Sequence, residues 1–142
     1  MNVLNIRGND VTFDADVVGP WVFERAGGKF LPGCCTAIGL VKDGKIAAGV
    51  TYSDYNGASV VCGIAGEGRW ANRGFLWLIF AYPFLQLKVK RITTFINPNN
   101  TVSKKFTLKL GFTLESTMKD AHPEGDMWMT CMLRNECKWI EV

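Results

Sequence analysis

The sequence has little histidine and no paired-cysteine motif, and this argues against a metal site. His122 is its one histidine, and its five cysteines include no C-x-x-C pair. His122 does not stand at zinc-ligand spacing from any of them. An odd cysteine count without a signal peptide is typical of reduced thiols in the cytoplasm. We therefore expect no metal, a cytoplasmic protein, and cysteines that serve as small core residues.

The sequence also lacks a hydrophobic run long enough to span a membrane. The apolar run at residues 75–87 is too short for a span, and Pro83 interrupts it. A buried helix with a kink explains this run better. We therefore expect no membrane association.

A strong excess of charge of either sign is missing as well. The net charge is +3, from 16 basic and 13 acidic residues, which is too small by itself to indicate nucleic acid. The basic residues are unevenly placed, however, and six of them fall within residues 88–109. This cluster is either a solvated face or an anion site, such as one for the ribose phosphate of a coenzyme. We do not expect nucleic acid as a partner.

What the sequence does contain is enough apolar material for one domain. Hydrophobic residues make up 48% of its 142 residues, and no repeat, low-complexity tract or linker divides it. We expect a single domain over residues 1–142, present as a monomer or a homodimer.

Patterning predicts alternating strands and helices. Strands are expected at residues 3–6, 36–42, 45–52, 58–65, 91–96, 112–118 and 127–133. Helices are expected from Asp14 or Asp16 to about residue 26, at residues 72–87, and at residues 100–111, although the first could begin at Pro20. The dipeptides Asp43-Gly44 and Asn56-Gly57 mark tight turns. The order is therefore β-α-βββ-α-β-α-ββ.

Residues 97–112 contain the signals of a complete capped helix. Pro98 favours an extended Asn97, and Asn99 or Asn100 can accept amide protons at the helix start. Gly111 stands where a left-handed C-terminal cap is needed. A four-residue spacing predicts a buried stripe of Val102, Phe106 and Leu110, with Lys104, Lys105 and Lys109 facing outward. A basic helix with amide groups at its start suits a phosphate-bearing ligand.

This order of elements, together with three motifs, resembles the GCN5-related N-acetyltransferase (GNAT) family. Asn100-x-x-Ser103, Leu110-Gly111-Phe112 and Glu115 are similar to a segment of its ribosomal-protein and antibiotic acetyltransferase branches. The segments 82–87, 91–92 and 125–139 resemble small bacteriophage-encoded members, for which the location would be the host cytoplasm. The resemblance implies a single α/β (α+β) domain with a mixed central sheet of six to seven strands flanked by three to four helices.

The resemblance also implies acetyl-CoA as co-substrate. In the family a Gln/Arg-x-x-Gly-x-Gly/Ala loop holds the coenzyme pyrophosphate on backbone amides. Residues 69–74 match it at Arg69 and Gly74, with Asn72 in place of the first glycine. The alternative for residues 69–74 is an ordinary loop with a surface arginine, without a role in binding. The alternative for Asn100 is a plain helix cap. The implied cofactor-binding residues are Cys62, Ile64, Ala65, Gly66, Arg69, Asn72, Arg73, Gly74, Asn100, Ser103 and Lys104.

The catalytic groups expected from the resemblance are missing. Many relatives have a glutamate on the strand that corresponds to residues 58–65, which contains no carboxylate, and a tyrosine where this chain has Thr107. The remaining candidates for acid or base are Glu67, Glu115 and His122. A base acting through ordered water would need none of them. Tyr52, Asp54, Tyr55 and Trp70 are candidates for lining the acceptor pocket.

Two functions follow from the resemblance. The first is direct transfer of an acetyl group from acetyl-CoA to an amine of a protein or a small molecule. The second is a catalytically weakened GNAT scaffold that binds or inhibits a host protein, since binding needs only the fold and an exposed surface.

Overall fold

The structure, a computed structural model, describes residues 3–6 and 9–140 and centres on one mixed sheet. Its eight strands lie in the order β1-β2-β3-β4-β5-β6-β8-β7, and only β5 and β6 pair in parallel. The strands are β1 (Val3–Ile6), β2 (Asn9–Thr12), β3 (Thr36–Lys42), β4 (Lys45–Ser53), β5 (Ser59–Gly66), β6 (Arg91–Ile96), β7 (Thr113–His122) and β8 (Gly125–Leu133). The α+β sheet architecture expected from the sequence is confirmed. Strand β2 is additional, because its sequence NDVT is short, has three polar residues out of four and gives no alternation signal.

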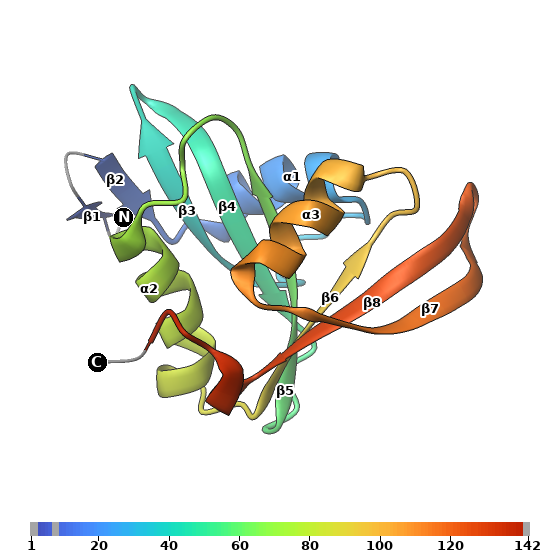
Figure 1. The fold of residues 1–142 in the computed structure, drawn as a ribbon. Coiled ribbons are helices and arrows are strands. Elements are labelled where there is room, and N and C mark those ends of the chain that lie inside the picture. The colour runs from blue at the N-terminus through green and yellow to red at the C-terminus, as the bar shows by residue number, and fades with distance from the viewer. Residues whose placement is uncertain (1–2, 7–8, 141–142) are drawn as a thin grey trace.

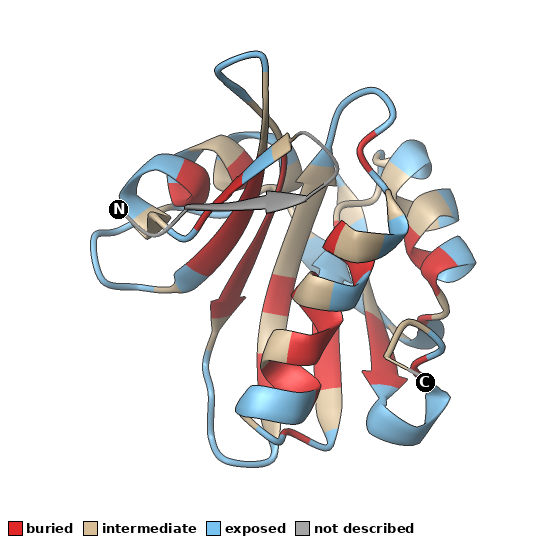
Figure 2. Ribbon diagram, turned by 90° about the vertical axis from the view of Figure 1, so that its left-hand side faces the viewer, coloured by how far each residue is buried: buried red, intermediate tan, exposed pale blue. Residues whose placement is uncertain are grey.

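The helices cover the two faces of the sheet unequally. Helix α1 (Ala15–Ala26) lies on one face, and α2 (Arg73–Ala81) and α3 (Thr101–Leu110) lie on the other (Figures 1 and 2). The larger core fills the space between the sheet and α2 and α3, and it includes Phe75, Phe80 and Phe84. A smaller core beneath α1 contains Val18 and Val22. No helix among the described residues is long and apolar enough to cross a membrane.

The first two helices begin close to the residues that the sequence predicts, and a side chain caps each of them. Asp14 accepts a hydrogen bond from the Asp16 amide (3.1 Å), so α1 starts before Pro20 rather than at it. Asn72 accepts one from the Phe75 amide (2.8 Å) at the start of α2. The second helix is not regular to its end, because residues Tyr82–Gln86 form a π-helical turn around Pro83.

Helix α3 is capped as expected, and Phe106 and Leu110 of its predicted stripe pack on the core, but Val102 does not. Asn100 accepts from the Ser103 amide (3.0 Å), and Gly111 is left-handed with φ 115°. Thr107 and Leu110 are buried, whereas Val102 is 79% exposed, so its expected burial is wrong. The reason is position: Val102 lies in the first helical turn, beside a cleft rather than above the sheet.

Replacing Val102 with alanine is expected to change the free energy of unfolding by less than about 0.5 kcal/mol, because the side chain is largely exposed. Alanine also has the higher helix propensity. Chemical denaturation measures the change. A loss of about 2 kcal/mol or more would show that Val102 is a core residue after all.

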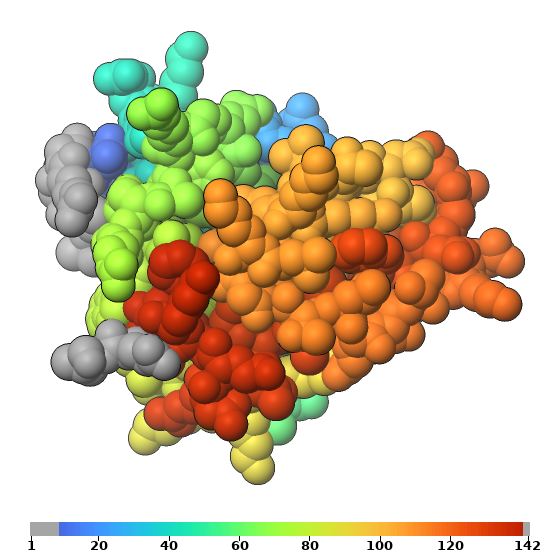
Figure 3. Space-filling model, in the orientation of Figure 1, coloured from blue at the N-terminus to red at the C-terminus, as the bar shows by residue number. Residues whose placement is uncertain are grey.

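The chain ends in a long hairpin and a segment that fastens α3 to the core. Strands β7 and β8 extend to the pair His122↔Gly125, so most of the loop expected at residues 120–126 is strand. After β8 the chain passes between α2 and α3 (Figure 3, red). There the Trp139 indole N–H donates to the Leu110 carbonyl (2.8 Å). This bond satisfies one of the carbonyls left open at the end of α3.

Candidate functional site

The site begins where two parallel strands separate. The ladder between β5 and β6 runs from Ser59↔Arg91 to Val61↔Thr93 and ends there. Strand β5 continues to Gly66, still paired with β4 on its other side. Residues 62–66 therefore have no strand partner on the β6 side within the described part of the chain. Backbone amides on such an edge can pair with an extended ligand.

A cleft of about 830 Å³ lies at this separation, between the end of β5, the loop to α2, and α3. Figure 3 shows this face, with α3 in orange beside the green loop. The volume lies within the usual range for small-molecule sites, which is about 300–1,000 Å³. A second, narrow hollow of about 20 Å³ adjoins the cleft at this gap and shares part of its lining. Ala26 and Phe95 line that hollow, and so do Ser103 and Thr107 of α3.

Most of the residues predicted to bind the cofactor meet at these two hollows. The cleft is lined by Ile64, Ala65, Gly66, Arg69, Asn72, Asn100 and Ser103, and Cys62 lines the narrow hollow. Arg73 and Gly74 lie in the first turn of α2 and are not among the lining residues. Burial raises the pKa of the Cys62 thiol, which keeps it neutral.

Lys104 is engaged elsewhere. Its ammonium group donates to the Pro98 carbonyl (2.7 Å) and lies 4.7 Å from the centre of the Trp128 ring. These contacts hold it at the start of α3 and against β8. A phosphate contact by Lys104 would require both to break.

Trp70 forms a wall of the cleft and packs into the core. Its ring stacks on Phe106, with 4.9 Å between ring centres, and meets Phe75 edge-on at 6.0 Å. The indole lies directly over Gly66, where a Cβ atom would come within 2.1 Å of Nε1. Glycine at this position therefore lets the indole sit against the end of β5. Trp70 shapes the cleft chiefly by packing.

Glu67 is the candidate acid or base that lies in the cleft, and it is paired with an arginine from α1. The Arg25 Nε–H donates to Glu67 Oε2 at 3.0 Å. Arg25 also lines the cleft. Sequence reasoning missed Arg25 because nothing in the pattern of α1 shows that its last turn lies beside the loop after β5.

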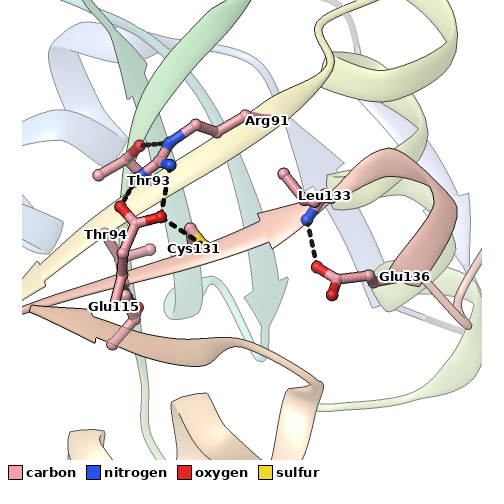
Figure 4. A network of polar contacts seen from close by, with 8 residues as sticks. Arg91, Thr93, Thr94, Glu115, Cys131, Leu133 and Glu136 are labelled. Atoms are coloured by element: carbon pink, nitrogen blue, oxygen red, sulfur yellow. Dashed lines mark hydrogen bonds and ion pairs between the residues drawn. The ribbon is translucent and has the colours of Figure 1, made fainter.

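Glu115 lies outside the cleft, in an ion pair with Arg91 that bridges from β7 to β6 over the intervening β8 (Figure 4). The Arg91 guanidinium of β6 donates to both of its oxygens, at 2.6 and 2.9 Å, and lowers the pKa of Glu115. The Cys131 thiol, on the intervening strand β8, also donates to Glu115 (3.5 Å). These contacts make Glu115 a clamp that joins β7 to β8 and β6. Glu115 lines neither the cleft nor the narrow hollow.

The Arg91–Glu115 pair predicts a specific pH dependence of stability. A carboxyl whose pKa is lower in the folded state stabilises the fold above its unfolded pKa of about 4.3 and loses that contribution as the pH falls through its folded pKa. Glu115→Gln should therefore lower the melting temperature at pH 7 and flatten its decline below about pH 4.3. A pH series of thermal unfolding measures both effects. Glu24→Gln is the control, because the Glu24 carboxylate is 79% exposed and its ion pair with Arg25 is a single long contact of 4.0 Å; an equal change there would contradict the assignment.

His122 is also outside the cleft. It closes the β7–β8 hairpin, where its Nδ1 accepts a hydrogen bond from the Glu124 amide (3.1 Å). It lines neither of the two hollows. The structure therefore does not bring His122 and Glu115 together with Glu67.

The residues expected at the acceptor pocket from the end of β4 do not line the cleft either. Tyr52 is a core residue whose hydroxyl donates to the Ile79 carbonyl (2.6 Å), and burial raises its pKa. Asp54 and Tyr55 are exposed, and the Tyr55 hydroxyl donates to the Leu87 carbonyl (3.4 Å). The polar side chains that do face both hollows are Asn100, Ser103 and Thr107 of α3.

Comparison with known proteins was made on sequence and on structure. No protein-family model and no curated protein sequence matches the chain. Among solved structures, ribosomal-protein-S5-alanine acetyltransferase from Vibrio fischeri matches 97% of this chain and 100% of its own, with TM-score 0.70 and 16% identity. A GNAT-family acetyltransferase from Bacillus anthracis matches 95% and 100%, with TM-score 0.62 and 16% identity.

A third solved structure contains acetyl coenzyme A. The N-acetyltransferase PseH from Campylobacter jejuni, in complex with acetyl coenzyme A, matches 71% of this chain and 69% of its own, with TM-score 0.55 and 16% identity. At these identities the likeness is one of fold. The chain has the fold of the GNAT acetyltransferases.

Proposed function

We propose that the protein transfers an acetyl group from acetyl-CoA to an amine. The observation that supports this most directly is the cleft at the separation of β5 and β6, beside which a narrow hollow lies in the gap between the strands. A donor in the cleft would present its acetyl group at that gap, and an amine that reaches the gap from the Ala26 and Phe95 side requires the hollow of about 20 Å³ to widen. A single domain over residues 1–142 would suffice for both substrates.

The lining residues fit acetyl-CoA group by group. The unpaired edge of residues 62–66 suits the amide-bearing pantetheine arm. The loop between β5 and α2, with Arg69 and the helix start capped by Asn72, suits the pyrophosphate. Asn100 and Ser103 face the same space from α3 and offer hydrogen bonds to the coenzyme. Acetyl-CoA supplies an activated acyl carbon in the form of a thioester.

In the proposed reaction the amine nitrogen attacks the acetyl carbonyl carbon. The C–N bond forms, the C–S bond breaks, the amine loses a proton and the coenzyme sulfur gains one. Glu67 is the one carboxylate among the described cleft-lining residues, and Arg25 holds it. We therefore favour proton removal through ordered water, with the hydroxyls of Ser103 and Thr107 beside the gap.

Calorimetric titration with acetyl-CoA, followed by a thiol-release assay, tests the proposal. The amine panel includes a peptide beginning with alanine, a blocked peptide containing lysine, and a polyamine. Binding together with thiol release that depends on one of these amines is the expected result. Failure to bind acetyl-CoA would contradict the proposal, and binding without turnover on any amine would argue for the alternative below.

The alternative is a binding or inhibitory protein that uses the same scaffold. It is favoured by the engagement of Glu115 with Arg91 and of His122 within its own hairpin, which leaves few groups for proton transfer. On the resemblance to bacteriophage-encoded members, its partner would be a host protein in the host cytoplasm. Affinity capture with purified protein, with and without saturating CoA, separates the two functions. Capture that is indifferent to CoA, together with absent turnover, would favour the scaffold.

A further inference from the structure

Arg25 stands out because it comes from the helix on the opposite face of the sheet and still lines the cleft. Its guanidinium is fixed at several points. Nε donates to Glu67 Oε2 and Nη1 donates to the Trp21 carbonyl, both at 3.0 Å. The guanidinium carbon also lies 3.8 Å from the centre of the Trp21 ring. A guanidinium held in this way loses little further conformational entropy when it binds an anion.

Glu67 is the more easily displaced member of the ion pair. Its side chain is 63% exposed, against 31% for Arg25, and only one of its oxygens accepts from Arg25. A phosphate group carries more acceptor oxygens than a carboxylate and pairs with arginine through two parallel hydrogen bonds. An anion in the cleft can therefore replace Glu67 on Arg25 without moving α1.

The charge around the cleft favours such an exchange. Its charged lining residues are Arg25, Glu67 and Arg69, so the described lining carries one more positive charge than negative. Two further charges lie nearby: the Lys42 ammonium group donates to the Arg69 carbonyl, and the Glu24 carboxylate, 79% exposed, lies 4.0 Å from Arg25 Nη1. The positive charge is concentrated where β5 ends and the loop to α2 begins.

We propose that Arg25 is a phosphate-binding residue of this cleft, and that a phosphate of the bound coenzyme takes the place of Glu67 on its guanidinium. This rests on the proposed function, in which the coenzyme occupies the cleft. The cleft-lining loop residues 69–72 and the start of α3 would then hold the ligand from one face of the sheet, and Arg25 from the other. Glu67 acts in this proposal as the counter-ion of the empty cleft.

Calorimetric titration of three variants tests the exchange. Arg25→Gln should weaken acetyl-CoA binding by about tenfold, since one charge-assisted pair is lost. Glu67→Gln should leave the affinity unchanged or raise it by about threefold, because the competing carboxylate is gone. Arg134→Gln removes the same charge from an exposed site outside the cleft and should have no effect. Arg25→Lys should recover part of the affinity, and melting temperatures show whether each variant is folded.

Dephospho-CoA, which lacks the 3′-phosphate, identifies the phosphate that Arg25 contacts. If Arg25→Gln weakens CoA but not dephospho-CoA, the contact is to the 3′-phosphate, and equal weakening of both points to the pyrophosphate. Unchanged affinity of a folded Arg25→Gln variant for both would overturn the inference and leave the proposed function standing. So would a loss of affinity in Glu67→Gln as large as that in Arg25→Gln. Wild-type protein that binds neither nucleotide would overturn the proposed function, and this inference with it.

Discussion

Gly66→Val is expected to destabilise the protein by at least about 3 kcal/mol and to abolish acetyl-CoA binding. A Cβ atom at residue 66 would come within 2.1–2.4 Å of three atoms of the Trp70 indole. The indole has no room to shift slightly aside, because it is stacked on Phe106 and also contacts Phe75. It would have to leave the core, and the cleft wall and the loop after β5 would move with it. Chemical denaturation and calorimetric titration measure the two effects.

A double-mutant cycle shows whether the cost comes from this contact. Gly66→Ala should be strongly destabilising in the wild-type background but cost less than about 1 kcal/mol in a Trp70→Ala background, where the obstructing ring is absent. A glycine with positive φ, such as Gly44 with φ 75°, cannot serve as the control, because alanine is strained there for a different reason. The comparison of Gly66→Ala between the two backgrounds is therefore the control. Equal costs of Gly66→Ala in both backgrounds would mean that backbone conformation, not the indole, requires glycine here.

The parts of the fold that the sequence predicted well are those controlled by local signals. Asp43-Gly44 closes its hairpin with positive φ at both residues. The predicted caps at Asn100 and Gly111 set the ends of α3, because the Asn100 side chain accepts from the amide three residues on and the left-handed Gly111 satisfies free carbonyls. None of these depends on which elements lie next to one another in space.

The inward face of α3 was harder to predict at its first turn, although Phe106 and Leu110 pack on the core as expected. Val102, Phe106 and Leu110 are the apolar series, yet the structure buries Thr107 with Leu110 and leaves Val102 exposed. A helix that lies against a sheet along its whole length would bury the apolar series. The first turn of α3 instead borders the cleft, so Val102 and Ser103 line open space. The mistake therefore occurred at the candidate site, where packing rules are not expected to hold.

Side-chain pairs between distant elements were beyond sequence reasoning. Arg25 and Glu67 are 42 residues apart, and Arg91 and Glu115 are 24 apart. Each pair forms only because the topology brings α1 beside the loop after β5, or β6 and β7 to either side of β8. Glu67 and Glu115 looked equivalent as carboxylates near the candidate site. The structure distinguishes them: Glu67 faces the cleft beside Arg25, whereas Glu115 pairs with Arg91 and joins strands of the sheet.

Ser103→Glu should reduce acetyl-CoA affinity by about 100-fold, or about 3 kcal/mol, while leaving the fold intact. Ser103 faces both the cleft and the narrow hollow, so a longer, charged side chain would fill the gap and repel a phosphate-bearing ligand. The same substitution suits the helix. Asn100 caps α3, and a glutamate in the first turn interacts favourably with the helix dipole. The melting temperature should therefore be unchanged or slightly higher.

Thr101→Glu is the matched control for this separation of binding from stability. It introduces the same charge in the same helical turn, at an exposed residue that lines neither hollow. Its effect on affinity should stay below about threefold, the size expected of a screened surface charge. If both variants weaken binding equally, the loss is a general electrostatic effect and α3 does not face the coenzyme. If Ser103→Glu binds acetyl-CoA as tightly as the wild type, the coenzyme lies elsewhere than in the gap between β5 and β6.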